Sequence, residues 1–354
     1  MKKIGIITLH FSNNYGAVLQ TYALHKTISR LDGCDVKIIP FCKKSFVFGK
    51  RTCSQIEQVL MNEKKNSLRK FLIDECGIEP LDTEDISNYL DIDYYVVGSD
   101  QVWNTSFLLF DENYLLKFVP ENAKRIAYAA SIGMNLKNNR FQRSVFEKYL
   151  PLFDDISIRE IEHLNFVEEC SKKKCELVLD PTLLLEKKDY EELLPQKEVC
   201  EKYILLFWIS HDDTLFQGID FANKIALKYG YKIYHCFEDL PECLIMNSAG
   251  SIYYGEVQDF LWYIKNAEII ITNSFHAVTF SILFEKAFYV FSEQAMSSRI
   301  ENLKYLFNIK DRCIDTFLPM EDVNFDMDYE QINRKLKRYR KQSLDFLKAA
   351  LDII

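Results

Sequence analysis

The chain has 354 residues, 48% hydrophobic and 27% charged, a composition typical of a globular protein with two domains of about 100–200 residues each. Its formal net charge of −8 at pH 7 argues against general nucleic-acid binding, because that function uses a basic face. No apolar run approaches the roughly 20 residues of a membrane-spanning helix, so we expect no transmembrane segment.

The chain begins with an apolar run of strand length. Met1-Lys2-Lys3 and the apolar residues after it resemble the start of a signal peptide, but the run is too short and lacks a cleavage pattern. We therefore interpret residues 4–8 as the first strand of a cytoplasmic enzyme. The ten cysteines show no CxxC pair and no zinc-type His spacing, so we expect reduced thiols, no metal site and no cofactor.

Strand and helix patterns alternate through the first half of the chain. The strand at 4–8 is followed by a helix at 17–31 and a strand at 36–39, and this order predicts a parallel sheet. The charged segment 43–90 lacks clear strands, so we interpret it as a solvated helical insertion rather than a binding patch. Further strands are expected at 94–97, 126–130, 156–158 and 176–179.

A segment with two prolines and a charged helical piece, residues 180–202, is the expected junction between two α/β domains. We expect an N-terminal domain over 1–190, with the helical insertion at about 43–90, and a C-terminal domain over 191–327. The second sheet should contain the strands 203–209, 232–236, 251–254, 269–271 and 287–291, with a helix at 215–229.

Residues 328–354 are expected to form a long terminal helix that packs back on the N-terminal domain. Six Arg and Lys residues lie between Arg334 and Lys341. A solvated helix is one interpretation of this basic stretch. Peripheral contact with an anionic membrane surface is the alternative, although no strong apolar face accompanies the charges.

Polar residues follow several of the expected strands, where ligands of parallel α/β sheets bind. After the first strand, Asn13 or Asn14 can cap the next helix and Gly16 permits close backbone approach. Capping alone and ligand contact both remain open for this loop. It matches neither GxxxxGK[ST] nor GxGxxG, so it does not indicate a nucleotide cofactor.

Two further strand ends carry candidate functional side chains. Asp100 could take a proton from a substrate hydroxyl, and Trp103 could stack on a sugar, with a helix cap and a core residue as the alternatives. Arg159 could bind a carboxylate or phosphate in a two-pronged pair. Its alternative is a structural ion pair with Glu160 or Asp180.

The stretch 268–284 changes from a strand pattern to a helical pattern at Asn273-Ser274-Phe275-His276. His276 would therefore stand at a helix N-terminus, where N–H groups and the helix dipole favour anions. We interpret it as an anion contact or proton donor. Arg299 could add a second anion contact, or it could be an exposed cap.

Six short segments follow one another in an order typical of one family. They are Asn14-Tyr15-Gly16-Ala17, Val97-Gly98-Ser99-Asp100-Gln101-Val102-Trp103-Asn104, Tyr128-Ala129-Ala130-Ser131-Ile132-Gly133, Ser157-Ile158-Arg159-Glu160, Leu179-Asp180-Pro181-Thr182 and Thr272-Asn273-Ser274-Phe275-His276. The ordered set, over about 4–305, resembles the polysaccharide pyruvyl transferase family.

The resemblance implies a fold similar to the GT-B glycosyltransferases, with two Rossmann-like domains and an active cleft between them. It implies transfer of a pyruvyl group from phosphoenolpyruvate to two hydroxyls of a sugar as a ketal. The donor-binding Arg and His of the family would fall on Arg159 and His276, with Arg299 as an alternative for the Arg. Ala277 stands where many members have Gly, which places a methyl group near the proposed anion site.

Our hypothesis assigns catalysis to His276, as donor-phosphate ligand or general acid, and to Asp100, as activator of the acceptor hydroxyl. The C-terminal domain would bind the donor, through Asn273, Ser274 and Arg299 together with Arg159. The acceptor, a carbohydrate that is either free or lipid-linked, would contact Asn14, Tyr15, Gly16 and Trp103. The alternatives are a GT-B glycosyltransferase that uses a sugar nucleotide and a non-catalytic carbohydrate-binding partner.

Overall fold

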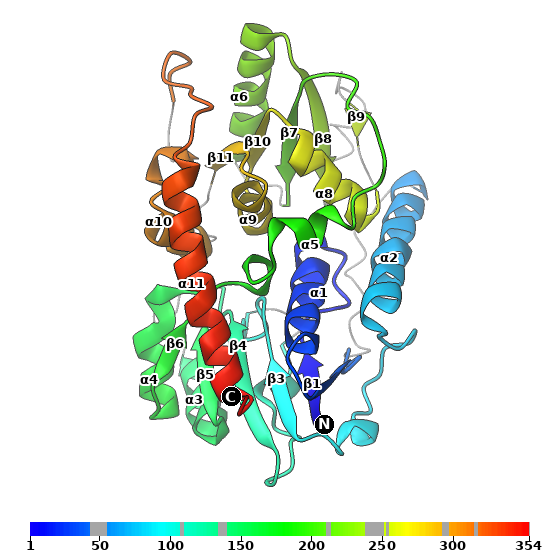
Figure 1. The fold of residues 1–354 in the computed structure, drawn as a ribbon, viewed down its shortest axis with the longest axis vertical. Helices are drawn as coiled ribbons and strands as arrows, with labels where there is room; N and C mark the ends of the chain where they lie inside the picture. Colours follow the sequence, from blue (N-terminus) through cyan, green and yellow to red (C-terminus); the bar gives the residue numbers. More distant parts are fainter. Residues whose placement is uncertain are drawn as a thin grey trace.

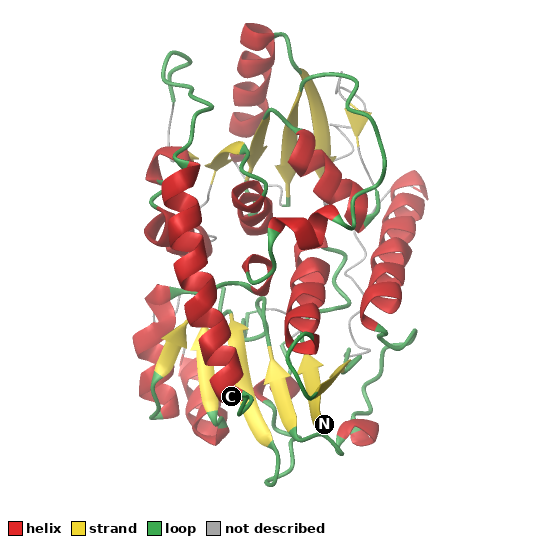
Figure 2. Cartoon of the chain, viewed as in Figure 1, coloured by secondary structure: helices red, strands yellow, loops and turns green. Residues whose placement is uncertain are grey.

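The computed structural model of the chain describes residues 1–42, 55–106, 110–133, 140–209, 214–237, 251–252, 255–291, 297–314 and 318–353. They form two α/β lobes, one above the other along the long axis of the molecule (Figure 1). Each lobe contains a parallel sheet with helices packed around it, as Figure 2 shows. The expected α/β class with two parallel sheets is confirmed.

The sheet of the N-terminal lobe has the strand order β2-β1-β3-β4-β5-β6, and every neighbouring pair is parallel. The direction of strand addition reverses between β1 and β3, which creates a topological switch point where ligands of such sheets bind. The strands are β1 (Lys2–Ile7), β2 (Cys34–Ile38), β3 (Tyr94–Val97), β4 (Lys124–Ala130), β5 (Asp155–Ile158) and β6 (Cys175–Leu177).

Helix α1 (Tyr15–Ser29) follows β1 and begins at an Asn cap. The side chain of Asn14 accepts a hydrogen bond from Ala17 N at 3.0 Å, which satisfies one of the free N–H groups of the first turn. Residues 43–54 of the predicted insertion 43–90 lie outside the described residues. The remainder of the insertion contains α2 (Gln55–Cys76) and the 3-10 helix η1 (Ser87–Tyr89). The other helices of this lobe are η2 (Glu112–Leu115), α3 (Arg140–Tyr149), η3 (Leu150–Leu152), η4 (Ile161–His163), α4 (Leu164–Ser171), η5 (Pro181–Leu183) and α5 (Lys187–Glu191).

The sheet of the C-terminal lobe has the order β12-β11-β10-β7-β8-β9, again with parallel neighbours throughout. Its switch point lies between β7 and β10, whose residues are all buried because both faces of the sheet are covered. The strands are β7 (Tyr203–Trp208), β8 (Lys232–Phe237), β9 (Ser251–Ile252), β10 (Ile269–Thr272), β11 (Ala287–Phe291) and β12 (Cys313–Ile314). Residues 253–254 of the predicted strand 251–254 lie outside the described chain.

One hydrophobic cluster extends through both lobes. It contains side chains of α1 and α2 together with side chains of β7, α8 (Val257–Asn266), α9 (Phe275–Leu283) and α10 (Ser297–Phe307). The ring of Tyr15 stacks on Phe260 with the centroids 4.7 Å apart, and its hydroxyl donates to Gly255 O at 2.8 Å. The described helices of the C-terminal lobe are these three, α8, α9 and α10, together with α6 (Thr214–Tyr229) and the 3-10 helix η7 (Lys310–Arg312).

The last helix, α11 (Tyr329–Ala350), runs from the C-terminal lobe to the N-terminal lobe (Figure 1). Leu336 packs in the cluster shared by the lobes, whereas Leu347 packs against the N-terminal sheet. Arg340 donates a hydrogen bond to Leu183 O at 2.7 Å. The helix therefore contacts both halves of the protein and ends on the first.

Candidate active site

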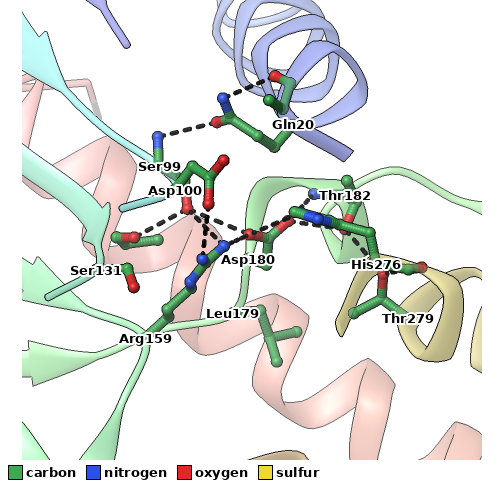
Figure 3. Close-up of polar contacts among 12 residues, drawn as sticks. Gln20, Ser99, Asp100, Ser131, Arg159, Leu179, Asp180, Thr182, His276 and Thr279 are labelled. Atoms are coloured by element: carbon green, nitrogen blue, oxygen red, sulfur yellow. Dashed lines mark hydrogen bonds and ion pairs between the residues drawn. The ribbon is translucent and has the colours of Figure 1, made fainter. Parts of the chain in front are cut away.

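Polar side chains from both lobes meet where the carboxyl ends of the two sheets face each other (Figure 3). Asp100 comes shortly after β3, Arg159 directly after β5, and Asp180 shortly after β6. His276 lies in the first turn of α9, just beyond β10. Because each follows a strand of a parallel sheet, all four lie at the carboxyl ends of the two sheets, where the lobes meet.

The guanidinium of Arg159 is buried at the centre of this group and is surrounded by carboxylates. Its Nη2 donates to Asp100 Oδ1 at 3.0 Å, its Nη1 pairs with Asp180 Oδ2, and its Nε lies 3.4 Å from Glu160 Oε1. The guanidinium carbon lies 4.7 Å from the ring centroid of Phe275. Burial disfavours the charge, but Asp180, Asp100 and Glu160 outweigh it and raise the pKa of Arg159.

The carboxylate of Asp180 is fully buried and accepts hydrogen bonds on both oxygens. Oδ1 accepts from Thr182 N at 3.0 Å and from Thr182 Oγ1 at 2.8 Å, and Oδ2 accepts from Ser99 Oγ at 3.2 Å. His276 Nε2 lies 3.7 Å from Oδ2, beyond a hydrogen bond. Burial alone would raise the pKa of Asp180, yet His276 and Arg159 hold it well below the usual carboxyl range.

The imidazole of His276 packs directly on the backbone of α1 in the other lobe. A Cβ atom at Gly16 would lie 2.0 Å from His276 Nδ1, so this approach requires a glycine. Ser274 caps α9, because its side chain accepts from Ala277 N at 3.3 Å. The N-termini of α1 and α9 therefore both lie beside the imidazole, and both favour a bound anion.

Arg299, in the first turn of α10, is a second buried guanidinium. It is 7% exposed and has no hydrogen bond or ion pair with any part of the chain that the structure describes. Burial and the positive charge of Arg159 lower the pKa of Arg299, whereas Asp100, Glu160 and Asp180 act in the opposite direction. α10 is placed by Asn302, whose Oδ1 accepts from Ile161 N at 3.3 Å beside Glu160.

This arrangement can bind an anion and move a proton. Arg159 is matched by carboxylates, but Arg299 is a buried cation without a direct partner among the described residues, and such a charge is costly unless a ligand compensates it. Asp100 can accept a proton, and the imidazole of His276 can exchange one. We find no cluster of three or more His, Cys, Asp or Glu residues suited to a metal ion in the described ranges.

Two of the predicted acceptor-binding residues, Trp103 and Tyr15, are buried in packed interiors of the protein. Trp103 is fully buried among Phe146 and Phe153, and its indole N–H donates to Tyr114 O at 3.0 Å. The ring therefore fills the core of the N-terminal lobe and presents no face to a sugar. Tyr15 likewise contacts the C-terminal lobe, as described above. For Trp103, the geometry favours the core position over a sugar contact.

The other predicted residues at the junction make local structural contacts. Asn14 and Ser274 cap α1 and α9, and Asn273 Oδ1 accepts from Ile209 N at 2.9 Å, which ties the end of β10 to the end of β7. Gly16 makes room for His276. Ala277 is fully buried in the shared hydrophobic cluster.

Sequence reasoning left Asp180 and Ser99 out of the proposed site. Both follow strands of the same sheet edge as Asp100, and that position was the available signal. Ser99 N donates to Gln20 Oε1 at 3.0 Å, and Gln20 Nε2 donates to Thr8 Oγ1 at 2.9 Å, so α1 is also tied to the site. Asp180 is the residue that connects Arg159 with His276.

Solved structures of similar fold cover nearly the whole chain at low identity. S. aureus MnaA, in a co-structure with UDP, has a TM-score of 0.56 at 10% identity and covers 100% of this chain and 98% of its own. The glycotransferase of kitacinnamycin has a TM-score of 0.52 at 11% identity, with 99% and 100% covered. UDP-GlcNAc 2-epimerase from Neisseria meningitidis, bound to UDP-GlcNAc, has a TM-score of 0.50 at 11% identity. The match covers 98% of this chain and 100% of the epimerase chain. These neighbours show a fold of the GT-B type, as the family resemblance implied.

The family follows from the sequence match. The family model for polysaccharide pyruvyl transferase matches residues 14–294, which include Asp100, Arg159, Asp180 and His276. The chain belongs to this family and is accordingly a transferase. A search of curated proteins finds no match. None of the described helices is long and apolar enough to cross a membrane.

Proposed function

We propose that the protein transfers a pyruvyl group from phosphoenolpyruvate to two hydroxyls of a sugar in a surface polysaccharide or its precursor. The observation that carries this proposal is Arg299, a buried guanidinium with no direct partner in the described chain, beside Arg159 and the carboxylates around it. A donor with two anionic groups, a carboxylate and a phosphate, supplies the negative charge that this cation lacks.

The reaction needs an acid, a base and cations for the phosphate, and the junction has side chains suited to each. A proton is added to C3 of phosphoenolpyruvate, an acceptor oxygen bonds to C2, and a second acceptor oxygen replaces the phosphate on C2. One hydroxyl proton ends on C3, which becomes a methyl group, and the other leaves with the phosphate. The requirements are therefore an acid, a base and cations for the phosphate.

We assign these roles to particular side chains. His276 stands where α1 and α9 direct their N-termini, so it is suited to contact the donor phosphate or to deliver the proton to C3. Arg159 and Arg299 bind the donor anions. Asp100 accepts the proton of the attacking hydroxyl, because it is the site carboxylate with solvent exposure, 14% for its side chain.

The acceptor is a carbohydrate, free or lipid-linked, and we place the reaction in the cytoplasm, where phosphoenolpyruvate is formed. A sugar-nucleotide glycosyltransferase of the same fold is the competing function, because fold alone does not determine the reaction. The two differ in their donor, so donor binding separates them.

The test is calorimetric titration with phosphoenolpyruvate and, separately, with UDP-GlcNAc. We expect binding of phosphoenolpyruvate and none of UDP-GlcNAc, together with phosphate release when a hydroxyl acceptor is added. His276→Ala should lower turnover by roughly 10²–10⁴-fold, the usual contribution of a positioned acid or base. Asp345→Asn, an exposed change on α11, serves as the control. Binding of UDP-GlcNAc without phosphoenolpyruvate would overturn the proposal.

A further inference from the structure

The three carboxylates around Arg159 are not equivalent. The side chains of Asp180 and Glu160 are 0% exposed, and each accepts additional hydrogen bonds, Asp180 from Thr182 and Glu160 Oε1 from Ser131. Asp100 differs, because its side chain is 14% exposed and its carboxylate has a single hydrogen bond within the described residues, from Arg159 Nη2. Asp100 is therefore the partner of Arg159 that can be exchanged.

The backbone of Asp100 is fixed independently of its side chain. Its φ of 63° lies in the left-handed region, where Asp and Asn occur more often than most residues. Its carbonyl accepts from Ser131 N at 3.0 Å and from Val102 N at 2.8 Å. Because these bonds do not involve the carboxylate, the side chain can leave Arg159 while the loop after β3 stays in place.

We propose that Asp100 occupies, in the absence of substrate, the position that the carboxylate of phosphoenolpyruvate takes on Arg159. This inference rests on the proposed function and adds the order of events to it. When one carboxylate replaces the other, Arg159 still has three carboxylate partners rather than four, so the charge in direct contact with it is unchanged. The displaced Asp100 loses its cation and becomes available as a base.

Donor binding thereby controls acceptor activation. While Asp100 is paired with Arg159, its Oδ1 is held by a charged hydrogen bond, and the carboxylate cannot move toward an acceptor hydroxyl. Once the donor carboxylate is on Arg159, Asp100 takes the proton of the attacking hydroxyl, and this proton later departs with the phosphate. The phosphate of the donor is left to Arg299 and the helix N-termini beside His276.

The test is Asp100→Asn, compared with wild type and with Asp345→Asn as the matched Asp-to-Asn control. Asn tolerates the left-handed backbone and keeps the shape of the side chain, but it removes the competing charge. We expect Asp100→Asn to bind phosphoenolpyruvate about tenfold or more tightly, because a charged hydrogen bond no longer has to be broken. Inorganic phosphate, which has no carboxylate, should bind wild type and variant equally, and turnover should fall.

The outcomes separate this inference from the proposed function. If wild type binds phosphoenolpyruvate and Asp100→Asn binds it no more tightly, Asp100 does not occupy the subsite, although the function stands. If wild type does not bind phosphoenolpyruvate, both fail. Should the variant not fold, a crystal structure of the wild-type complex decides. The donor carboxylate must then lie within hydrogen-bond distance of Arg159 Nη2, and a retained Asp100–Arg159 pair would overturn the inference.

Discussion

The contact between Gly16 and His276 predicts a large effect of a single methyl group. A Cβ at position 16 would lie 2.0 Å from Nδ1 and 2.3 Å from Cγ of the imidazole. Non-bonded heavy atoms prefer about 3.5–4.0 Å, so the ring has to move by roughly 1.5 Å. Misplacement of a reacting group by about 1 Å can cost about 100-fold in rate. We therefore expect Gly16→Ala to lower turnover by roughly 10²–10⁴-fold.

The same change tests two opposing effects on stability. Alanine is a better helix former than glycine by up to about 1 kcal/mol, whereas overpacking a tight contact costs about 1–3 kcal/mol. Because His276 is 6% exposed and has little space to move, we expect the clash to win and the free energy of unfolding to fall. Urea denaturation measures this difference, and phosphate release from phosphoenolpyruvate measures turnover.

A double-mutant cycle with His276→Ala gives the decisive comparison. If Gly16→Ala acts through the imidazole, it should not lower activity further in the His276→Ala background, and the lost stability should return. Gly5→Ala is a matched control, because its Cβ would meet Ile92 Cδ1 at 2.7 Å, far from the site. It should lower stability and spare turnover. Wild-type activity of Gly16→Ala would refute the reasoning.

Two further predictions concern the charged groups of the site. Arg299→Met should leave the free energy of unfolding unchanged or higher, because it removes a buried cation without a partner among the described residues, and should weaken phosphoenolpyruvate binding at least about tenfold. Lower stability in denaturation with unchanged affinity in calorimetry would contradict it. Asp180→Asn should destabilise the protein most above the unfolded carboxyl pKa of about 4, because the pKa of Asp180 is lowered in the folded state. In urea titrations at several pH values its difference from wild type should shrink as the pH falls below about 4, and a constant difference would speak against this role.

The strands could be predicted from the sequence because apolar runs of strand length carry a local signal. The predictions for 94–97 and 287–291 coincide with β3 and β11, and the helix predicted at 215–229 differs from α6 by one residue. The polar residues after β3, β5 and β10 also followed from local pattern, since a parallel sheet directs all its carboxyl ends to one edge.

The partners of these side chains could not be predicted, because they depend on how elements far apart in the chain meet. Arg159 was open between an anion contact and an ion pair, and only the arrangement of the loops after β3 and β6 shows its pairs with Asp100 and Asp180. Trp103 was open between a sugar contact and the core, and the packing of α3 decides for the core. The approach of His276 to Gly16 depends on the docking of one lobe on the other.

The hydrophobic cluster shared by the lobes limits how halves of related proteins can be exchanged. By topology the two lobes look like separate modules, each with its own sheet. Their boundary is nevertheless a packed interior, in which Tyr15 of one lobe stacks on Phe260 of the other. A chimera that joins the first lobe to the second lobe of another family member would need this interior redesigned, because packed cores tolerate little change in shape. The two halves are therefore expected to vary together in evolution, as one inherited unit.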